Sequence, residues 1–162
     1  MGSCKEGKTM GSNTEILGGR QYPKDHPLIE CLGALDELNA FLGDAKLAVN
    51  DKVADIISGI QKDLFVVSGI LAGSQGKLPS TEELNTLIKE LEANLSPTAA
   101  FEIPGENPAS AKIHIARTVC RRAERRLVSL GQASNLDEDQ LNNFLAWINK
   151  LSYLLFILAR YV

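Results

Sequence analysis

Residues 112–130, KIHIARTVCRRAERRLVSL, decide the fold that the sequence predicts. Apolar residues recur through this stretch in alternating steps of three and four, which is the spacing of one buried stripe on an α-helix. The stripe consists of Ile113, Ala116, Cys120, Ala123, Leu127 and Leu130. A helix with such an unbroken seam packs lengthwise against its neighbours, so the stretch predicts a central helix of a bundle.

The same helix carries five arginines within ten residues. Arg117, Arg121 and Arg125 form a second stripe beside the seam, and Glu124 lies on it, whereas Arg122 and Arg126 point roughly 100° away. A solvated, salt-bridged face is one interpretation of such a run. The other is a ligand site, because guanidinium groups bind phosphate oxygens through paired hydrogen bonds.

The rest of the chain predicts four more helices and no strand. Apolar periodicity indicates helices over 28–49, 53–72, from Ser80 to near Asn94, and from about Asp137 to Tyr161. Asn107 and Pro108 are a good cap and first turn for the arginine helix, which we expect to end at Gly131. Residues 1–27 show no periodicity and predict a flexible, irregular leader. The expected fold is all-α, a five-helix up-and-down bundle with residues 28–162 as its single domain.

Composition excludes several function classes. The chain has 162 residues, of which 44% are hydrophobic and 23% charged, and its net charge is −3. An acidic protein does not hold nucleic acid by charge, so no nucleic-acid partner is expected. Three cysteines without metal spacing indicate reduced thiols and a cytoplasmic location. No apolar run reaches membrane-spanning length, and no signal segment is recognised, so no membrane partner is expected.

The reactive side chains argue against protein-borne nucleophiles and metals. His26 and His114 have no Ser or Cys partner at a suggestive spacing, and no Glu-x-x-His pairs are present. At the N-terminus, a G-x-x-x-x-G-K-T pattern ends in Lys8 and Thr9. A phosphate loop needs a strand before it and a helix after it, and the sequence predicts neither here. A Gly/Lys/Thr tail can still contact phosphate.

Four segments, in order, resemble the PduO-type ATP:cob(I)alamin adenosyltransferases. The segment ARTVCRRAERRL at 116–127 resembles the signature helix of that family, and residues 16–43, with their G-x-x-DELN core, resemble its first block. FEIPGENPASAKIHIAR at 101–117 and NKLSYLLFILAR at 149–160 resemble the segments before the signature and in the final helix. The resemblance therefore covers nearly the whole chain.

The resemblance implies a function and a set of site residues. Members of the family are homotrimeric helical bundles that transfer the 5′-deoxyadenosyl group of ATP to cob(I)alamin with the help of Mg²⁺, at sites between subunits. By position, the resemblance implies catalytic roles for Arg121, Asp36 and Arg117, the last two paired across the subunit boundary. The corresponding nucleotide-binding residues are Lys8, Thr9, Lys24, Arg121, Glu124, Arg125 and Asn149, and Phe101 matches the aromatic residue that contacts the corrinoid.

Two segments differ from the pattern of the family. The leader has Lys8 where the family has an aspartate, and the final motif has Lys150 and Tyr153 in place of an arginine and a carboxylate. The alternative function is therefore a non-enzymatic relative that binds ATP or a corrinoid as a carrier or regulator.

Overall fold

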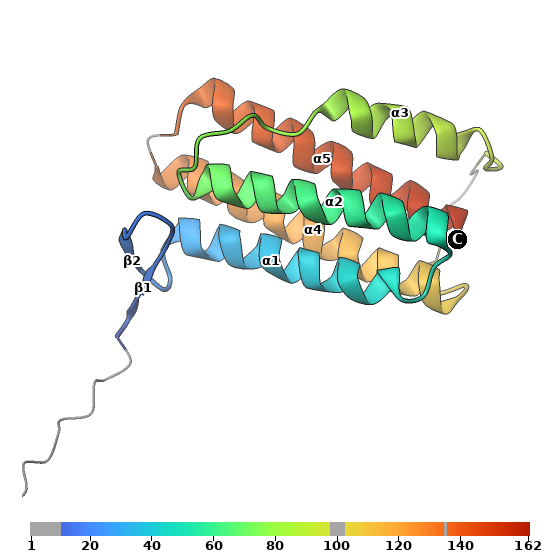
Figure 1. Ribbon diagram of the computed structural model, residues 1–162, viewed down its shortest axis with the longest axis horizontal. Coiled ribbons are helices and arrows are strands. Elements are labelled where there is room, and N and C mark those ends of the chain that lie inside the picture. Colours follow the sequence, from blue (N-terminus) through green and yellow to red (C-terminus); the bar gives the residue numbers. More distant parts are fainter. Residues whose placement is uncertain (1–10, 98–102, 135) are drawn as a thin grey trace, which may run out of the picture.

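The computed structural model describes residues 11–97, 103–134 and 136–162. Five helices form the body of the molecule (Figure 1): α1 (Pro27–Lys46), α2 (Asp51–Leu71), α3 (Thr81–Glu92), α4 (Pro108–Ala133) and α5 (Glu138–Tyr161). Two short strands, β1 (Asn13–Glu15) and β2 (Gln21–Pro23), precede them. The predicted all-α bundle of four long helices and one shorter helix is confirmed.

Helix α4 lies against α1 on one side and α5 on the other. Helix α2 packs on α1, and the short α3 packs on α5. Successive helices run in opposite directions, so one end of the bundle gathers the start of α1, the end of α2 and the β1–β2 hairpin (Figure 1). The up-and-down connectivity was expected from the short connections between the periodic segments.

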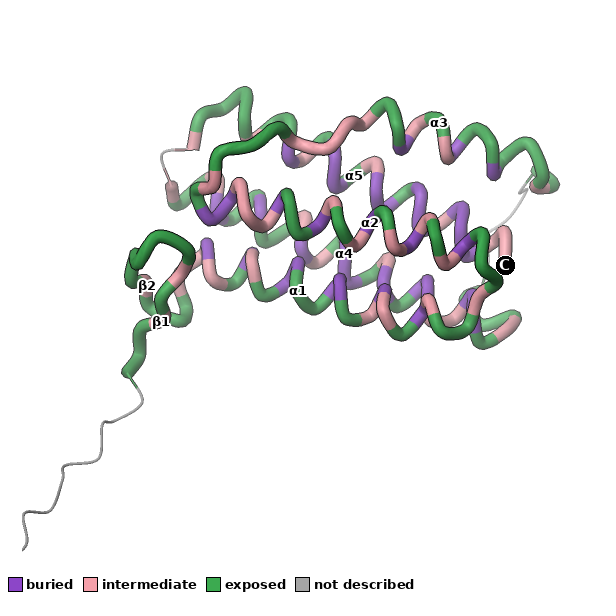
Figure 2. The backbone as a smooth tube through the Cα atoms, viewed as in Figure 1, coloured by how far each residue is buried: buried purple, intermediate pink, exposed green. Residues whose placement is uncertain are grey.

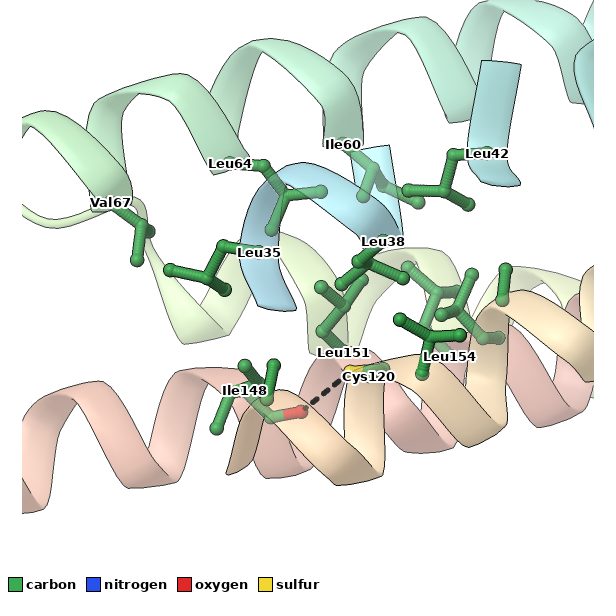
Figure 3. Close-up of a cluster of buried hydrophobic side chains, with 14 of the residues drawn as sticks. Leu35, Leu38, Leu42, Ile60, Leu64, Val67, Cys120, Ile148, Leu151 and Leu154 are labelled. Carbon is green, nitrogen blue, oxygen red and sulfur yellow. Dashed lines mark hydrogen bonds between the residues drawn. The ribbon is translucent and has the colours of Figure 1, made fainter. Parts of the chain in front are cut away.

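The apolar seams make the core, as Figure 2 shows by the inward-facing buried positions of each helix. All six seam residues predicted for α4 are buried. Leucines of α1 meet Ile60, Leu64 and Val67 of α2 and Leu151 and Leu154 of α5 (Figure 3). Cys120 lies among them and its Sγ donates to the Ile148 carbonyl oxygen at 3.6 Å. The small residues of the α4 seam let α1 and α5 approach it closely.

Two predicted helix starts are confirmed by their caps. The Asn107 side chain accepts a hydrogen bond of 2.8 Å from the Ser110 amide, and Pro108 occupies the first turn of α4. Ser80 caps α3, accepting from the Glu82 amide at 3.2 Å. In both cases a side-chain oxygen satisfies a backbone donor that has no partner inside the helix.

Gly131 does not end the arginine helix, contrary to the sequence prediction. The helix continues to Ala133, and Ser134 follows in an extended conformation. A Cβ on Gly131 would overlap the side chain of Leu141 in α5 and lie 3.2 Å from its Cγ. This glycine therefore serves close packing between α4 and α5, not a left-handed turn.

The leader was predicted to contain no strand, and this is wrong for residues 13–23. β1 and β2 pair antiparallel, with Thr14 opposite Tyr22. Gly18 and Gly19 have φ values of 84° and 75°, which L side chains rarely adopt, so they form the turn. Three-residue strands are too short to show a period of two, which is why the pattern did not reveal them.

Helix α5 is long and apolar enough, by length and composition, to cross a membrane. Half of its most apolar stretch is buried inside the bundle, which is the pattern of a core helix. The sequence predicted this helix as part of the bundle but showed no apolar run of membrane-spanning length, because polar residues such as Asn149 interrupt its apolar residues.

Candidate functional site: the arginine face of helix α4

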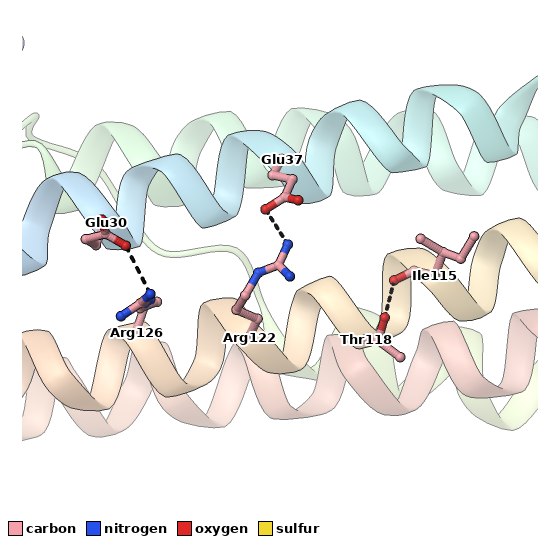
Figure 4. A network of polar contacts seen from close by, with 6 residues as sticks. All are labelled: Glu30, Glu37, Ile115, Thr118, Arg122 and Arg126. Atoms are coloured by element: carbon pink, nitrogen blue, oxygen red, sulfur yellow. Dashed lines mark hydrogen bonds and ion pairs between the residues drawn. The ribbon is translucent and has the colours of Figure 1, made fainter.

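The five arginines of α4 divide between two faces. Arg122 forms an ion pair with Glu37 of α1 (Figure 4). Arg126 Nη2 lies 3.2 Å from Oε2 of Glu30, which is also on α1. These two arginines join α4 to α1 across the bundle surface. Since all four side chains are nearly half exposed, each pair adds only modest stability.

Arg121 and Arg125 lie on the other face. Both are exposed, and among the described residues neither guanidinium group makes an ion pair. The contrast with Arg122 and Arg126 agrees with the predicted division of the helix into two faces. Two exposed guanidinium groups one helical turn apart, on an acidic protein, are a candidate site for an anion.

Glu124 and Asn149 lie together beside these two arginines. The Asn149 side-chain amide of α5 donates to Glu124 Oε1 of α4 at 3.0 Å. Glu124 follows Arg121 by three residues, so these two side chains are neighbours on the surface of α4. The structure thus brings four of the predicted nucleotide-site residues to one surface.

Arg117 is half-buried one turn before Arg121. Its Nε donates to His114 Nδ1 at 3.3 Å, and the His114 ring lies 6.3 Å from the ring of Phe156 in α5. His114 is itself buried. The sequence analysis found no Ser or Cys partner for His114, and it missed the contact of this residue with Arg117. The i, i+3 spacing was the available signal, since such residues are neighbours on a helix.

Asp36 and Lys24 lie apart from the Arg121 and Arg125 face. Asp36 is exposed on α1 and makes no hydrogen bond or ion pair with any described residue. Lys24 follows β2 and lines a hollow of about 210 Å³ with Arg122 and Arg126. A single chain therefore does not assemble all the predicted nucleotide-site residues in one place. Lys8, Thr9 and Phe101 lie outside the described residues.

A second hollow lies at the opposite end of the bundle. It has a volume of about 310 Å³ and lies between the end of α3, the start of α4 and the end of α5. Ile103, Ser110, His114 and Arg160 are among its lining residues. His114 lines this hollow and also accepts a hydrogen bond from Arg117, so the hollow lies next to Arg117.

Tyr153 occupies the position at which the resemblance has a carboxylate. Its hydroxyl donates to Glu92 Oε1 of α3 at 2.6 Å, and its ring stacks near Phe156 at 6.3 Å. The hydrogen bond to Glu92, with burial, raises the pKa of Tyr153. The tyrosine at this position thus connects α5 to α3 through its hydrogen bond to Glu92.

The fold and this surface define a class: five-helix-bundle proteins with exposed arginines on a central helix. The sequence pattern of one family, Cobalamin adenosyltransferase, matches residues 4–162. The chain belongs to this family.

Individual relatives agree with the assignment. A cobalamin adenosyltransferase of Cupriavidus metallidurans is 38% identical over 160 residues, covering 94% of this chain and 84% of the relative. The corrinoid adenosyltransferase PduO of Salmonella typhimurium is 37% identical over 158 residues, or 91% of this chain. The chain spans only 46% of the length of that PduO protein.

A solved structure has the same fold. It is a variant PduO-type ATP:corrinoid adenosyltransferase from Lactobacillus reuteri complexed with cobalamin and ATP. It superposes with a TM-score of 0.82 at 28% identity, covering 93% of this chain and 87% of the other.

Proposed function

We propose that the protein transfers the 5′-deoxyadenosyl group of ATP to the cobalt of cob(I)alamin, giving adenosylcobalamin and triphosphate. The observation that carries the proposal is that Arg121 and Arg125, which make no ion pair within the described part of the chain, lie beside the hydrogen-bonded Glu124 and Asn149. The two relatives named above, adenosyltransferases from two bacteria, support the choice of reaction.

The reaction needs little chemistry from the protein. The electron pair of Co(I) attacks C5′ of ATP, the C5′–O bond breaks, and triphosphate leaves with the bonding electrons. Arg121 and Arg125 would stabilise the charge that develops on the phosphate chain, and Glu124 and Asn149 would fix the nucleotide. Cob(I)alamin is itself the nucleophile, so no activated Ser, Cys or His is required.

We infer that Mg²⁺ arrives with the nucleotide. Over residues 11–97, 103–134 and 136–162, no group of three His, Cys, Asp or Glu side chains could hold a metal. Mg²⁺ commonly binds substrate phosphates with one or two protein ligands and several waters. The phosphate oxygens of ATP and bound waters would therefore supply most of the Mg²⁺ ligands.

The active site is proposed to lie between subunits of a homotrimer. Asp36 has no partner within the described chain, and Lys24 lies away from Arg121 and Arg125. A neighbouring subunit could supply both: its Asp36 would pair with Arg117, and its leader would bring Lys8, Thr9 and Lys24 to the phosphates. This arrangement accounts for the division of the site residues within one chain.

The corrinoid is proposed to bind near Phe101, at the end of the bundle that holds the 310 Å³ hollow. Ile103 lines this hollow and lies two residues after Phe101 in the sequence. Residues 1–27 would serve as the nucleotide-binding arm of the single domain at 28–162. A cytoplasmic location is proposed because Cys31 and Cys120 are buried free thiols, which a reducing compartment preserves.

The test is a spectrophotometric assay with chemically reduced cobalamin, ATP and Mg²⁺. Conversion to adenosylcobalamin with release of triphosphate supports the proposal. Binding of ATP or cobalamin without turnover would instead indicate the non-enzymatic carrier or regulator. The Lys150 and Tyr153 positions, which differ from the family pattern, are the first to exchange in that case.

A further inference from the structure

One arginine, Arg20, connects the β1–β2 hairpin to the C-terminal end of α2. Arg20 ends the hairpin turn, and its Nη2 donates a hydrogen bond to the Ala72 carbonyl oxygen, 52 residues away in sequence. The turn itself is closed by the Ile16 amide, which donates to the Arg20 carbonyl at 3.0 Å. Arg20 is thus rigidly placed relative to both strands.

The Ala72 carbonyl group that accepts the hydrogen bond from Arg20 lies where a positive charge is favourable. Ala72 is the C-terminal cap of α2, where carbonyl groups lack intrahelical donors and the helix dipole concentrates negative charge. The last turn of α2 contains no basic residue of its own. The guanidinium group of the hairpin supplies the missing charge.

Gly73 leaves the space that this contact requires. Its φ of +95° already disfavours any side chain. In addition, a Cβ there would overlap Arg20 Nη2 and lie 3.1 Å from Cζ. The geometry therefore favours glycine for two separate reasons: the turn after α2 needs a positive φ, and the contact with the hairpin needs the space.

The hairpin connects this junction to Lys24. β2 runs directly from Arg20 to Lys24, whose amide donates to the Ser12 carbonyl at 2.7 Å. At the other side of Lys24, the His26 side chain caps α1 by accepting from the Leu28 amide at 3.1 Å. Lys24 therefore lies between two contacts that fix the chain: the hydrogen bond of Arg20 to the end of α2 and the capping of α1 by His26.

We propose that Arg20 and Gly73 form a latch that positions Lys24 for the nucleotide phosphates. Both are positioning residues, because they act through the hairpin and not on the substrate. The inference rests on the proposed nucleotide-binding role of Lys24. Loss of the latch lets the hairpin leave α2, and nucleotide binding must then restore its position at a cost in affinity.

The experiment compares Arg20→Ala, Gly73→Ala and the double variant with Leu17→Ala, a control in the same turn whose side chain is 64% exposed. Hydrogen exchange of the Ile16 and Lys24 amides without nucleotide reports docking of the hairpin. Steady-state assays report KM for ATP and kcat separately, and equilibrium titration with ATP gives a dissociation constant that does not depend on turnover.

We expect faster exchange and a KM and Kd for ATP raised about three- to tenfold in both single latch variants, the effect of losing one hydrogen bond of ordinary strength. kcat at saturating ATP should change less than twofold. In amide exchange and ATP affinity, the double variant should be no worse than the more affected single variant, since for the hairpin both substitutions break the same contact. Leu17→Ala should match the unmodified chain.

Three results overturn the latch: unchanged exchange in Arg20→Ala, additive effects in the double variant, or an equal effect of Leu17→Ala. Faster exchange with unchanged ATP affinity overturns the positioning role of Arg20. Failure of the proposed function has a different signature. The unmodified chain would then form no adenosylcobalamin, while exchange and ATP titration still report on the latch.

Discussion

At the scale of single residues, the contacts of the arginines on α4 distinguish those that stabilise the bundle from those that are candidates for ligand binding. Arg122 and Arg126 are engaged with α1, and Arg121 and Arg125 are not engaged with any described carboxylate. Adjacent positions in the sequence therefore have different roles. The helical repeat alone produces this division, because neighbours in sequence point roughly 100° apart.

Arg121→Lys should weaken nucleotide binding or transition-state stabilisation by about 1.5–3 kcal/mol. Lysine keeps the charge but loses the planar fork that binds two phosphate oxygens. The matched control is Arg126→Lys, which should change either quantity by less than about 0.5 kcal/mol, as at an ordinary surface site. ATP titration and turnover measure both effects, and thermal melts show whether each variant is folded. Equal sensitivity of the two positions would contradict the assignment of the phosphate site.

The buried thiols predict a loss of stability at alkaline pH. Burial raises the pKa of Cys31 to about 12 and also raises the pKa of Cys120. A raised pKa means that the neutral thiol stabilises the fold fully below the pKa of the unfolded chain, and that this contribution is lost as pH rises toward the folded pKa. Between pH 7 and pH 10 we expect about 1.4–2 kcal/mol lost per thiol.

Urea unfolding at pH 7 and pH 10 measures this loss. Cys31→Ala has no thiol to ionise at that position, so its stability should fall less between the two pH values than that of the unmodified chain. Identical pH dependence in the two proteins would contradict the desolvation account of Cys31.

Much of the site could be predicted from the sequence because its residues share one helix. The four-residue spacing places Arg117, Arg121 and Arg125 on one stripe without knowledge of any other element. The hydrogen bond between Glu124 and Asn149 could not be predicted from spacing, since it depends on the register between α4 and α5. The ion pairs of Arg122 and Arg126 depend in the same way on the register between α4 and α1.

At the scale of elements, the helices were predictable and the hairpin was not. Long helices repeat their signal over many turns, and caps such as Asn107 fix their starts. The hairpin has three residues per strand, and its position depends on Arg20 reaching a helix 52 residues later. Gly131 shows the related limit for glycine: its neighbour in space, Leu141, decides its role.

The contact between Gly131 and Leu141 predicts that Gly131→Ala changes the free energy of unfolding in opposite directions with and without the Leu141 side chain. Gly131→Ala alone should destabilise the protein by up to about 2 kcal/mol, since overpacking against Leu141 outweighs the better helix propensity of alanine. In a Leu141→Ala background the space is free, and the same substitution should stabilise by up to about 1 kcal/mol. Chemical unfolding of the four proteins measures the cycle. Destabilisation of equal size in both backgrounds would show that Leu141 is not the cause.

At the scale of the whole molecule, the proposed shared site predicts complementation between inactive variants. Asp36→Ala and Arg117→Ala should each lower turnover at least about tenfold, because each removes one member of the intersubunit pair. Subunits from the two variants, unfolded together and refolded as mixed trimers, should regain activity. If partners assort at random, about one quarter of the sites receive an intact Asp36 and an intact Arg117.

Turnover before and after mixing measures the recovery, and sedimentation should give three times the 17.6 kDa mass of one chain. Two copies of the same variant, treated in the same way, are the control and should stay inactive. Absence of recovery in mixed trimers would place Asp36 and Arg117 in separate roles.

The regular rise of α4 also makes it a measure of length. Four residues separate Arg121 from Arg125, which corresponds to about 6 Å along the helix axis. If both guanidinium groups bind the nucleotide as proposed, its phosphate chain must be long enough to reach from one group to the other. The single phosphate of AMP should then leave one of the two groups without its anion. Preference for ATP over AMP would follow from the helical repeat of α4, with no separate element needed to recognise the terminal phosphate.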